Sequence, residues 1–353
     1  MQADYLIVGQ GISGTFLSWN LLNEGKTVRV IDQLQPATAS RVASGVINPL
    51  TGRRVVRTWM IDDLLPYARD AYGKLGEQFG LEFLHECSVL NFHSTLQMKD
   101  AFEQRVNEGE AFIRRGNEDE WKPYLNFIYG IGEVKPAYLV DIRLLLDAWR
   151  KHLQSLGLLS EEHFDHRELE ITEGQVRYRD ITAEKIIFCD GVSSFDHPLF
   201  QRLPFARNKG EALIVRIPGL PQGHILKQGI SIVPWKEDLF WVGSSYQWAF
   251  ENDLPTEGFR VKTQQALSFW LKLPFTIEDH LAAQRPATVE RRPFVGLHPL
   301  EPAVGILNGL GTKGCSLAPW FAKELARHLV YNEPITPEAD VKRFTRVLSR
   351  VAP

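Results

Sequence analysis

The chain has 353 residues, about two domains of ordinary size, and its 44% hydrophobic and 24% charged residues are typical of a folded globular protein. This composition excludes a disordered, collagen-like or coiled-coil chain. The 43 acidic and 40 basic side chains give a net charge of -3, which provides no electrostatic attraction to nucleic acid or to an anionic membrane. We therefore expect small molecules as partners, and neither nucleic acid nor a membrane.

Three cysteines, Cys87, Cys189 and Cys315, lie far apart and lack the spacing of a zinc site, so we expect no metal. Unpaired cysteines suit a reducing compartment. The chain starts without a basic and apolar leader, and no apolar stretch approaches the ~20 residues of a membrane-spanning helix. The expected location is the cytoplasm.

The first thirty residues predict a strand, a helix and a second strand. Residues 5–8 are a continuous apolar run that ends at Gly9, as in a parallel strand buried on both faces. Apolar residues recur at helical spacing over 12–23, and 27–32 form a second apolar run. We expect a βαβ unit with a right-handed crossover.

The rest of the chain alternates between helical and strand-like patterns. Helices are expected over 57–80, where Pro66 introduces a kink, over 139–156, and at the end of the chain, where Leu317, Phe321, Leu325 and Leu329 share one face. Strands are expected at 89–92, 175–178, 185–189 and 303–307. Three apolar runs between 211 and 243, broken by Pro and Gly, predict a second, mainly antiparallel sheet in an α/β chain.

A glycine motif follows the first strand. In Gly9-Gln10-Gly11-Ile12-Ser13-Gly14, the first glycine permits a tight turn and the second lets a pyrophosphate approach the helix N-terminus. The third glycine lets helix and strand pack closely. Asp32, eighteen residues after Gly14, can accept a hydrogen bond from a ribose hydroxyl. An acid there favours an adenosine without a 2′-phosphate, as in FAD or NAD.

Two further loops contain small residues at strand ends. Ser40-Arg41-Val42-Ala43-Ser44-Gly45 follows the second strand, and its composition alone fits a surface turn as well as a cofactor loop. An apolar strand stops at Cys189-Asp190-Gly191, where the backbone can meet a cofactor again. The buried character of Cys189 favours a small core residue over a nucleophile.

The C-terminal part contains an arginine motif and a glycine loop. Arg285 is either a solvated member of a basic run with Arg291 and Arg292 or a bidentate clamp for a carboxylate, which its planar guanidinium suits. The loop Gly309-Leu310-Gly311-Thr312-Lys313-Gly314 precedes the last helix, so its N–H groups can face negative charge.

These motifs, in this order, resemble the D-amino acid oxidase and glycine oxidase family of FAD-dependent oxidoreductases over nearly the whole chain. The matching blocks are the glycine motif, S-x-x-A-[AS]-G at 40–45, the strand end at 189–191, I-x-P…V-G at 232–243, R-P-x-T-x-[DE]…P-x-[IV]-G at 285–296 and G-x-[RK]-G…AP at 311–319. The first and fifth blocks are the most specific.

The resemblance implies a discontinuous, Rossmann-like FAD-binding domain (1–80, 132–200 and 281–353) and a substrate domain (81–131 and 201–280). It implies oxidation of a C–N bond in an amino acid or secondary amine. A hydride passes to flavin N5, water hydrolyses the resulting imine, and oxygen or another acceptor reoxidises the flavin. Arg285 would hold the substrate carboxylate, and the 309–314 loop would stabilise charge on the reduced flavin.

The chain also departs from this family. Amino acid oxidases usually carry a substrate-supporting tyrosine where this chain has Ser231, and Tyr246 is either its replacement or an ordinary half-buried tyrosine. The sarcosine oxidase branch has an oxygen-activating lysine where this chain has Trp241. The same branch links the flavin to a cysteine where this chain has Arg285, which implies non-covalent FAD.

Three alternatives remain open. The loop at 311–319 is similar to that of the flavin domain of a bifunctional tRNA wobble-uridine modifying enzyme, although the methyltransferase domain and a basic excess are absent. The Ser231 and Trp241 departures leave room for a flavin-binding protein without amine turnover. A plain NAD dehydrogenase would not need the later motif blocks. His163 and His166 have no third ligand nearby and are interpreted as part of a charged turn.

Overall fold

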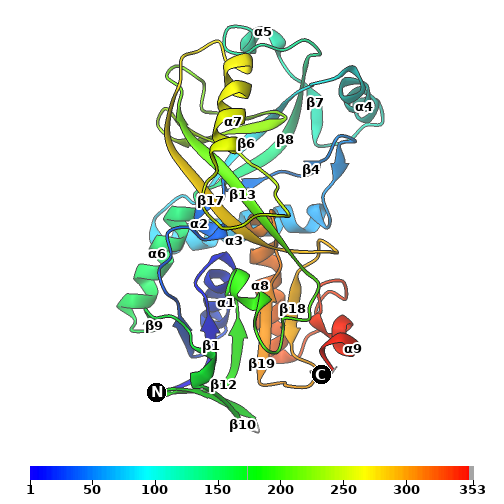
Figure 1. The fold of residues 1–353 in the computed structure, drawn as a ribbon. Coiled ribbons are helices and arrows are strands. Elements are labelled where there is room, and N and C mark those ends of the chain that lie inside the picture. Colours follow the sequence, from blue (N-terminus) through cyan, green and yellow to red (C-terminus); the bar gives the residue numbers. More distant parts are fainter. Residues whose placement is uncertain (173, 350–353) are drawn as a thin grey trace.

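The computed structural model describes residues 1–172 and 174–349. They form two large sheets, which lie one above the other along the long axis of the molecule (Figure 1). The first sheet has eight described strands in the order β10-β11-β12-β1-β2-β9, with β19 and β18 continuing from β12. Its strands are β1 (Gln2–Val8), β2 (Val28–Ile31), β9 (Leu159–Ser160), β10 (Leu169–Thr172), β11 (Gln175–Tyr178), β12 (Ile181–Phe188), β18 (Phe294–Leu297) and β19 (Val304–Asn308).

The predicted βαβ unit is confirmed. Strands β1 and β2 are parallel neighbours joined by α1 (Ile12–Asn23), and β12 and β19 extend the parallel part on the other side of β1. Residues 5–8 of β1 are apolar on both faces because helices cover one side of the sheet and a second cluster of side chains covers the other.

Long helices pack on the first face of this sheet. They are α1, α3 (Ile61–Phe79), α6 (Ile142–Ser155) and α8 (Gly314–Tyr331). All three helices expected beyond the first are present, and α3 continues through Pro66 as one element. Phe16, Tyr72 and Phe321 are essentially inaccessible in the core between them, where burial of one such ring contributes about 2 kcal/mol.

The second sheet has nine described strands in the order β17-β13-β16-β15-β14-β6-β8-β3, with β7 beside β8. It is mainly antiparallel, as the runs between 211 and 243 predict, although β14 and β6 are parallel. Its strands are β3 (Val46–Ile47), β6 (Leu84–Phe92), β7 (Ile113–Arg115), β8 (Ile131–Val140), β13 (Phe205–Arg216), β14 (His224–Gln228), β15 (Ile230–Lys236), β16 (Leu239–Gly243) and β17 (Thr276–Thr288).

Shorter elements complete the chain. A hairpin joins β4 (Leu50–Thr51) to β5 (Val56–Arg57). The other helices are α2 (Ala39–Val42), α4 (Leu96–Asn107), α5 (Glu118–Trp121), α7 (Glu257–Trp270), α9 (Thr345–Leu348) and the 3-10 turns η1 (His166–Glu168), η2 (Gly191–Phe195) and η3 (Val341–Phe344). Among these, α4, α5 and α7 lie at the end of the molecule farthest from both termini (Figure 1).

Strand pairing crosses the expected domain limits at three places. Strands β3 and β8 and the C-terminal half of β17 fall in the ranges expected for the FAD-binding domain, yet all three pair within the second sheet. Long-range pairing decides this membership, and no local pattern reports it. In the described part of the chain, no helix is long and apolar enough to cross a membrane.

Candidate active site

One cavity of about 710 Å³ lies where the two sheets face each other. This volume is within the roughly 300–1,000 Å³ typical of small-molecule sites. Of the predicted site residues, its wall includes Gly9, Gly11, Ile12, Ser13, Asp32, Ser40, Ala43, Ser44, Gly45, Gly191, Gly311, Thr312, Lys313, Gly314 and Arg285. Three others, Gly14, Gly309 and Tyr246, are not part of the wall. The fold therefore gathers segments from both ends of the chain around one space.

Where β1 turns into α1, there is no room for a side chain at Gly9 or Gly14. Gly9 has a φ of 97°, and a Cβ there would lie 2.5 Å from the carbonyl oxygen of Cys189. A Cβ on Gly14 would lie 1.9 Å from the carbonyl oxygen of Gly9. Gly11 has no side chain that could cap α1, and Ser40 Oγ accepts only from the Ile12 N–H, so the other N–H groups of the first turn are available to an anion in the cavity.

Asp32 follows β2 and is held by two donors. Its Oδ1 accepts from the Gln10 N–H at 2.8 Å, and its Oδ2 accepts from Nη1 of Arg150 at 2.7 Å. The Arg150 side chain is nearly buried, and its Nη2 donates to the Asp32 carbonyl at 3.2 Å. This pair fixes the carboxylate orientation at the wall. Arg150 lies 118 residues away on α6, so the sequence provides no local signal for it.

The Ser40–Gly45 segment lies in the cavity wall, so the surface-turn interpretation does not describe it. Ser40 Oγ accepts from the Ile12 N–H at 3.2 Å, which connects this loop to the first turn of α1. Gly45 has a φ of 81°, and a Cβ there would lie 2.0 Å from the Val140 carbonyl oxygen. The loop is therefore fixed between the two sheets.

Asp190 and Asn308 stand at the ends of β12 and β19 and were not predicted as site residues. Burial raises the pKa of Asp190 to about 7, and the Ser194 hydroxyl donates to its carboxylate. Asn308 Nδ2 donates to the Gly191 carbonyl at 2.7 Å. Their place at the strand ends could have identified them as site residues, because ligands of α/β sheets bind at the carboxyl ends of parallel strands.

The loop before α8 contributes a second helix N-terminus. Gly309 and Gly311 have φ values of 79° and 56°, and no side chain caps the helix at Lys313. Burial, with smaller contributions from Arg292, Arg291 and Lys227, lowers the pKa of Lys313 to about 8. The cavity thus has helix N-termini from both ends of the sequence in its wall.

Arg285 extends from β17 over the neighbouring strand β13. Its Nη1 donates to Oδ1 of Asn208 at 2.6 Å and to the Ser245 carbonyl at 3.2 Å. A Cβ on Gly210 would lie 1.9 Å from Nη2, so glycine there makes room for the guanidinium. No carboxylate of the described residues lies within 4.0 Å of it. Burial lowers its pKa, which means that this charge lacks full compensation.

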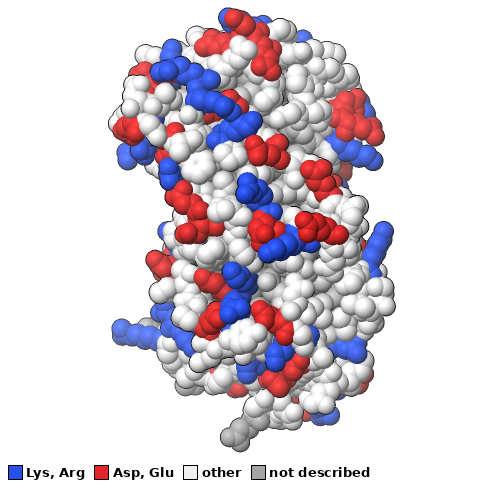
Figure 2. Space-filling view, turned by 180° about the vertical axis from the view of Figure 1, so that it is seen from behind, with Lys and Arg blue, Asp and Glu red and all other residues white. Residues whose placement is uncertain are grey.

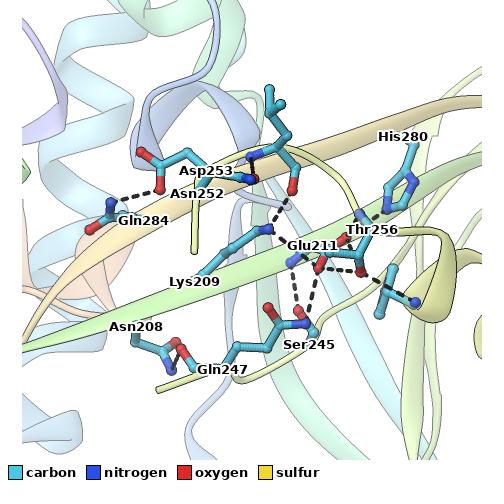
Figure 3. A network of polar contacts seen from close by, with 12 residues as sticks. Asn208, Lys209, Glu211, Ser245, Gln247, Asn252, Asp253, Thr256, His280 and Gln284 are labelled. Carbon is cyan, nitrogen blue, oxygen red and sulfur yellow. Dashed lines mark hydrogen bonds and ion pairs between the residues drawn. The ribbon is translucent and has the colours of Figure 1, made fainter. Parts of the chain in front are cut away.

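A buried polar cluster on the opposite face of β13 fixes the loop that contacts Arg285 (Figure 3). The carboxylate of Glu211 is inaccessible and accepts from the Thr256 N–H at 2.6 Å and from Gln247 Nε2 at 3.0 Å. His280 Nε2 lies 3.0 Å from the same carboxylate, and Lys209 Nζ lies 3.8 Å from it. This cluster, which the sequence analysis missed, ties residues 245–256 to the sheet.

Ser231 and Trp241, where the chain departs from the family, and Tyr246, the candidate replacement for the missing tyrosine, lie in different places. Tyr246 is 55% exposed; its ring centroid lies 4.9 Å from Cζ of Arg285, and its hydroxyl lies 3.4 Å from that of Thr312. Ser231 faces the cavity from β15. Trp241 does so from β16, with Nε1 donating to the Val42 carbonyl at 3.0 Å. Tyr246 therefore contacts Arg285 from outside the cavity wall.

His163 and His166 also lie in the wall. Within residues 1–172 and 174–349, no group of three or more His, Cys, Asp or Glu side chains could hold a metal ion.

Comparison with known proteins identifies the family. The family model described as "FAD dependent oxidoreductase" matches residues 4–328. The chain belongs to this family of FAD-dependent oxidoreductases. It is 22% identical to the uncharacterized oxidoreductase YurR of Bacillus subtilis, over 92% of this chain and 94% of that one.

Solved structures share the fold. Glycine oxidase from Geobacillus kaustophilus matches with a TM-score of 0.80 and 19% identity over 100% of both chains. Iminodiacetate oxidase from Chelativorans sp. BNC1 matches with a TM-score of 0.75 and 23% identity, over 94% of this chain and 96% of that one. The predicted family, fold class and cofactor are confirmed.

The residues present fit FAD. The glycine turn and uncapped N-terminus of α1 suit its pyrophosphate, and Asp32 can accept from its ribose. The second helix N-terminus, at Lys313, suits the electron-rich edge of its flavin ring. These donors lie in the wall of a cavity that extends to Arg285.

Proposed function

We propose that the protein oxidises a C–N bond of an amino acid or secondary amine that carries a carboxylate. The observation that carries this proposal is the Arg285 guanidinium, which is partly buried, has no carboxylate partner in the described chain, and lies in the same cavity wall as the glycine turns. A planar, bidentate donor of this kind suits a carboxylate ligand.

The role proposed for Arg285 is to position the substrate. Hydrogen bonds to Asn208 and Ser245 and the Tyr246 ring fix the guanidinium, so a bound carboxylate would fix the substrate's α-carbon relative to the cofactor site. FAD, when bound, accepts the hydride from that carbon. The substrate leaves as an imine, which water hydrolyses. Lys313 is another cation of the cavity wall, and it would stabilise the negative charge of the reduced cofactor.

The apolar part of the wall would keep bulk water from the reacting bond. Ile225, Val233 and Trp241 face the cavity from β14, β15 and β16 and are nearly inaccessible. A neutral amine gives up its α-hydrogen more readily in such a space, because fewer waters compete for its lone pair. No side-chain base is needed for this reaction.

Two further observations support a small amine as substrate. The names of the similar structures include glycine oxidase and iminodiacetate oxidase, which act on small amines with carboxylates. Lys and Arg alternate with Asp and Glu over the face drawn in Figure 2, a distribution that does not favour a polyanion such as RNA.

The test is an anaerobic visible spectrum of the purified protein before and after adding glycine, N-methyl amino acids, D- and L-amino acids and proline. We expect one class to bleach the oxidised flavin band, and readmitted air to restore it if oxygen is the acceptor. A yellow protein that no amine bleaches would contradict the proposal and favour the tRNA-modifying or non-catalytic alternatives. A steep salt dependence of RNA binding would separate those two.

A further inference from the structure

Besides Arg285 and Lys313, the cation Lys227 lies in the cavity wall. It comes from β14, where Ile225 and Lys227 face the cavity and the intervening Leu226 packs into the core on the other face. Strand pairing places it directly beside Ser231. Because serine is small, the lysine side chain has space at the position where amino acid oxidases usually have a bulky tyrosine. No motif of the family marks Lys227.

Lys227 has no partner among residues 1–172 and 174–349. Its ammonium makes no hydrogen bond or ion pair with any described residue, and burial lowers its pKa. Its charge also contributes to the lowered pKa of Lys313. A partly buried ammonium without a counter-charge is costly unless a ligand supplies one.

The acidic groups in the wall are engaged elsewhere. Their partners are Arg150 for Asp32, Arg179 for Glu162, Ser194 for Asp190, Arg207 for Asp196, Lys209 and His280 for Glu211, and Gln284 for Asp253. Among the described residues, therefore, the wall supplies Arg285, Lys227 and Lys313 without supplying the anions to neutralise them. Lys313 stands at the helix N-terminus that suits the flavin ring, which leaves Arg285 and Lys227 for the substrate.

These two cations are too far apart to share one carboxylate. The guanidinium of Arg285 lies over Gly210 of β13, and β16 and β15 separate β13 from β14. Neighbouring strands are about 4.8 Å apart, so three steps across the sheet amount to about 14 Å. An extended lysine covers less than half of that distance. Each cation would therefore bind a different anionic group.

We propose that the substrate is an amine with two carboxylates, of which Arg285 binds one and Lys227 the other. This inference rests on the proposed function and adds a specificity-determining residue to it. Lys227 is assigned to binding, and the hydride transfer needs nothing further from it.

The first experiment compares ligands that differ by one carboxylate. Iminodiacetate and sarcosine share the amine and one carboxylate, and longer N-carboxyalkyl amino acids vary the spacing of the second. In the holoenzyme we expect some dicarboxylate to have a KM about 10- to 100-fold lower than sarcosine, as one charged hydrogen bond gives. Lys227→Met should remove this preference by raising the KM of the dicarboxylate toward that of sarcosine. Lys262→Met, which removes an exposed lysine on α7, controls for net charge and should retain the preference.

A second measurement does not depend on turnover. Succinate and butyrate, or adipate and hexanoate, are titrated into the holoenzyme while the flavin spectrum is recorded. We expect the diacid of a pair to bind more tightly, and Lys227→Arg, which keeps the charge, to retain most of that difference. This variant and the wild-type comparison keep the proposal testable if Lys227→Met does not fold.

Several results would overturn the inference. Equal kcat/KM for mono- and dicarboxylates in the wild-type enzyme would reject it and leave the proposed function standing. An unchanged preference in Lys227→Met, combined with slower reoxidation by oxygen, would assign Lys227 to the oxygen reaction instead. If no amine of either class reduces the flavin, the proposed function fails and the inference fails with it.

Discussion

The two halves of the cavity are built by different means. The cofactor half uses backbone: glycines that a Cβ would obstruct, helix N-termini without caps, and strand ends of the first sheet. The substrate half uses side chains on neighbouring strands of the second sheet, such as Arg285, Ser231 and Lys227. Backbone geometry leaves a compact sequence motif, whereas side chains that meet across a sheet are scattered along the chain.

The difference has a functional consequence. A backbone cradle binds the part that all members of the family share, and few substitutions are tolerated there. Side chains on a preformed sheet can change one at a time without disturbing the fold. We therefore expect substitutions in the cofactor half to remove FAD, and substitutions in the substrate half to change KM while FAD remains bound.

Gly14→Ala should have the largest effect. The new Cβ would lie 1.9 Å from the Gly9 carbonyl oxygen, so β1 and α1 must separate. We expect a protein without the visible flavin band, or no soluble protein. Gly73→Ala is the control because nothing lies within 4 Å of a Cβ on this exposed position of α3. A yellow Gly14→Ala protein with normal FAD affinity would show that the close packing is dispensable.

Arg285→Met should come next. Losing a bidentate charged contact should raise KM for a carboxylate substrate by roughly 100-fold or more, with FAD still bound. Arg285→Lys, which keeps the charge and loses the planar donor pair, should give an intermediate KM. Steady-state kinetics and the flavin absorbance measure the two effects separately. Unchanged kinetics would remove Arg285 from the site.

The cofactor half of the cavity could be predicted from the sequence more fully than the substrate half. The glycine turn, the βαβ unit and the Ser40–Gly45 loop are local patterns, and the cavity wall contains them. Arg150 and Glu211 could not be predicted, because their partners are distant in sequence. The placement of β8 and β17 in the second sheet likewise depends on long-range pairing.

Glu211→Gln should have a smaller, indirect effect on the substrate half. An amide cannot accept on both sides, so its NH₂ would face a donor, either the Thr256 N–H or Gln247 Nε2. The 245–256 loop would loosen, and Ser245 and Tyr246 would orient Arg285 less well. We expect KM to rise about 5- to 20-fold with little change in kcat.

The control for this variant is Glu251→Gln, on an exposed part of the same loop. It should leave KM unchanged. An equal loss of kcat and FAD content in Glu211→Gln would indicate general destabilisation, and would contradict a positioning role for the cluster.

Asp190→Asn should have the smallest effect and reports on the cofactor half. The folded-state pKa of Asp190, about 7, is above the ordinary 3.8, so folding favours the protonated form. Its contribution to stability is complete below pH 4 and falls as the pH rises to 7, because the unfolded chain ionises first. Asn mimics the protonated carboxyl and does not titrate. The wild-type Tm should therefore fall relative to the variant by a few degrees between pH 5 and pH 8, a change that thermal unfolding of the two holoenzymes measures. A Tm difference that is constant with pH would show that Asp190 is ionised throughout, and that its contacts with Ser194 and Asn308 fully compensate its charge.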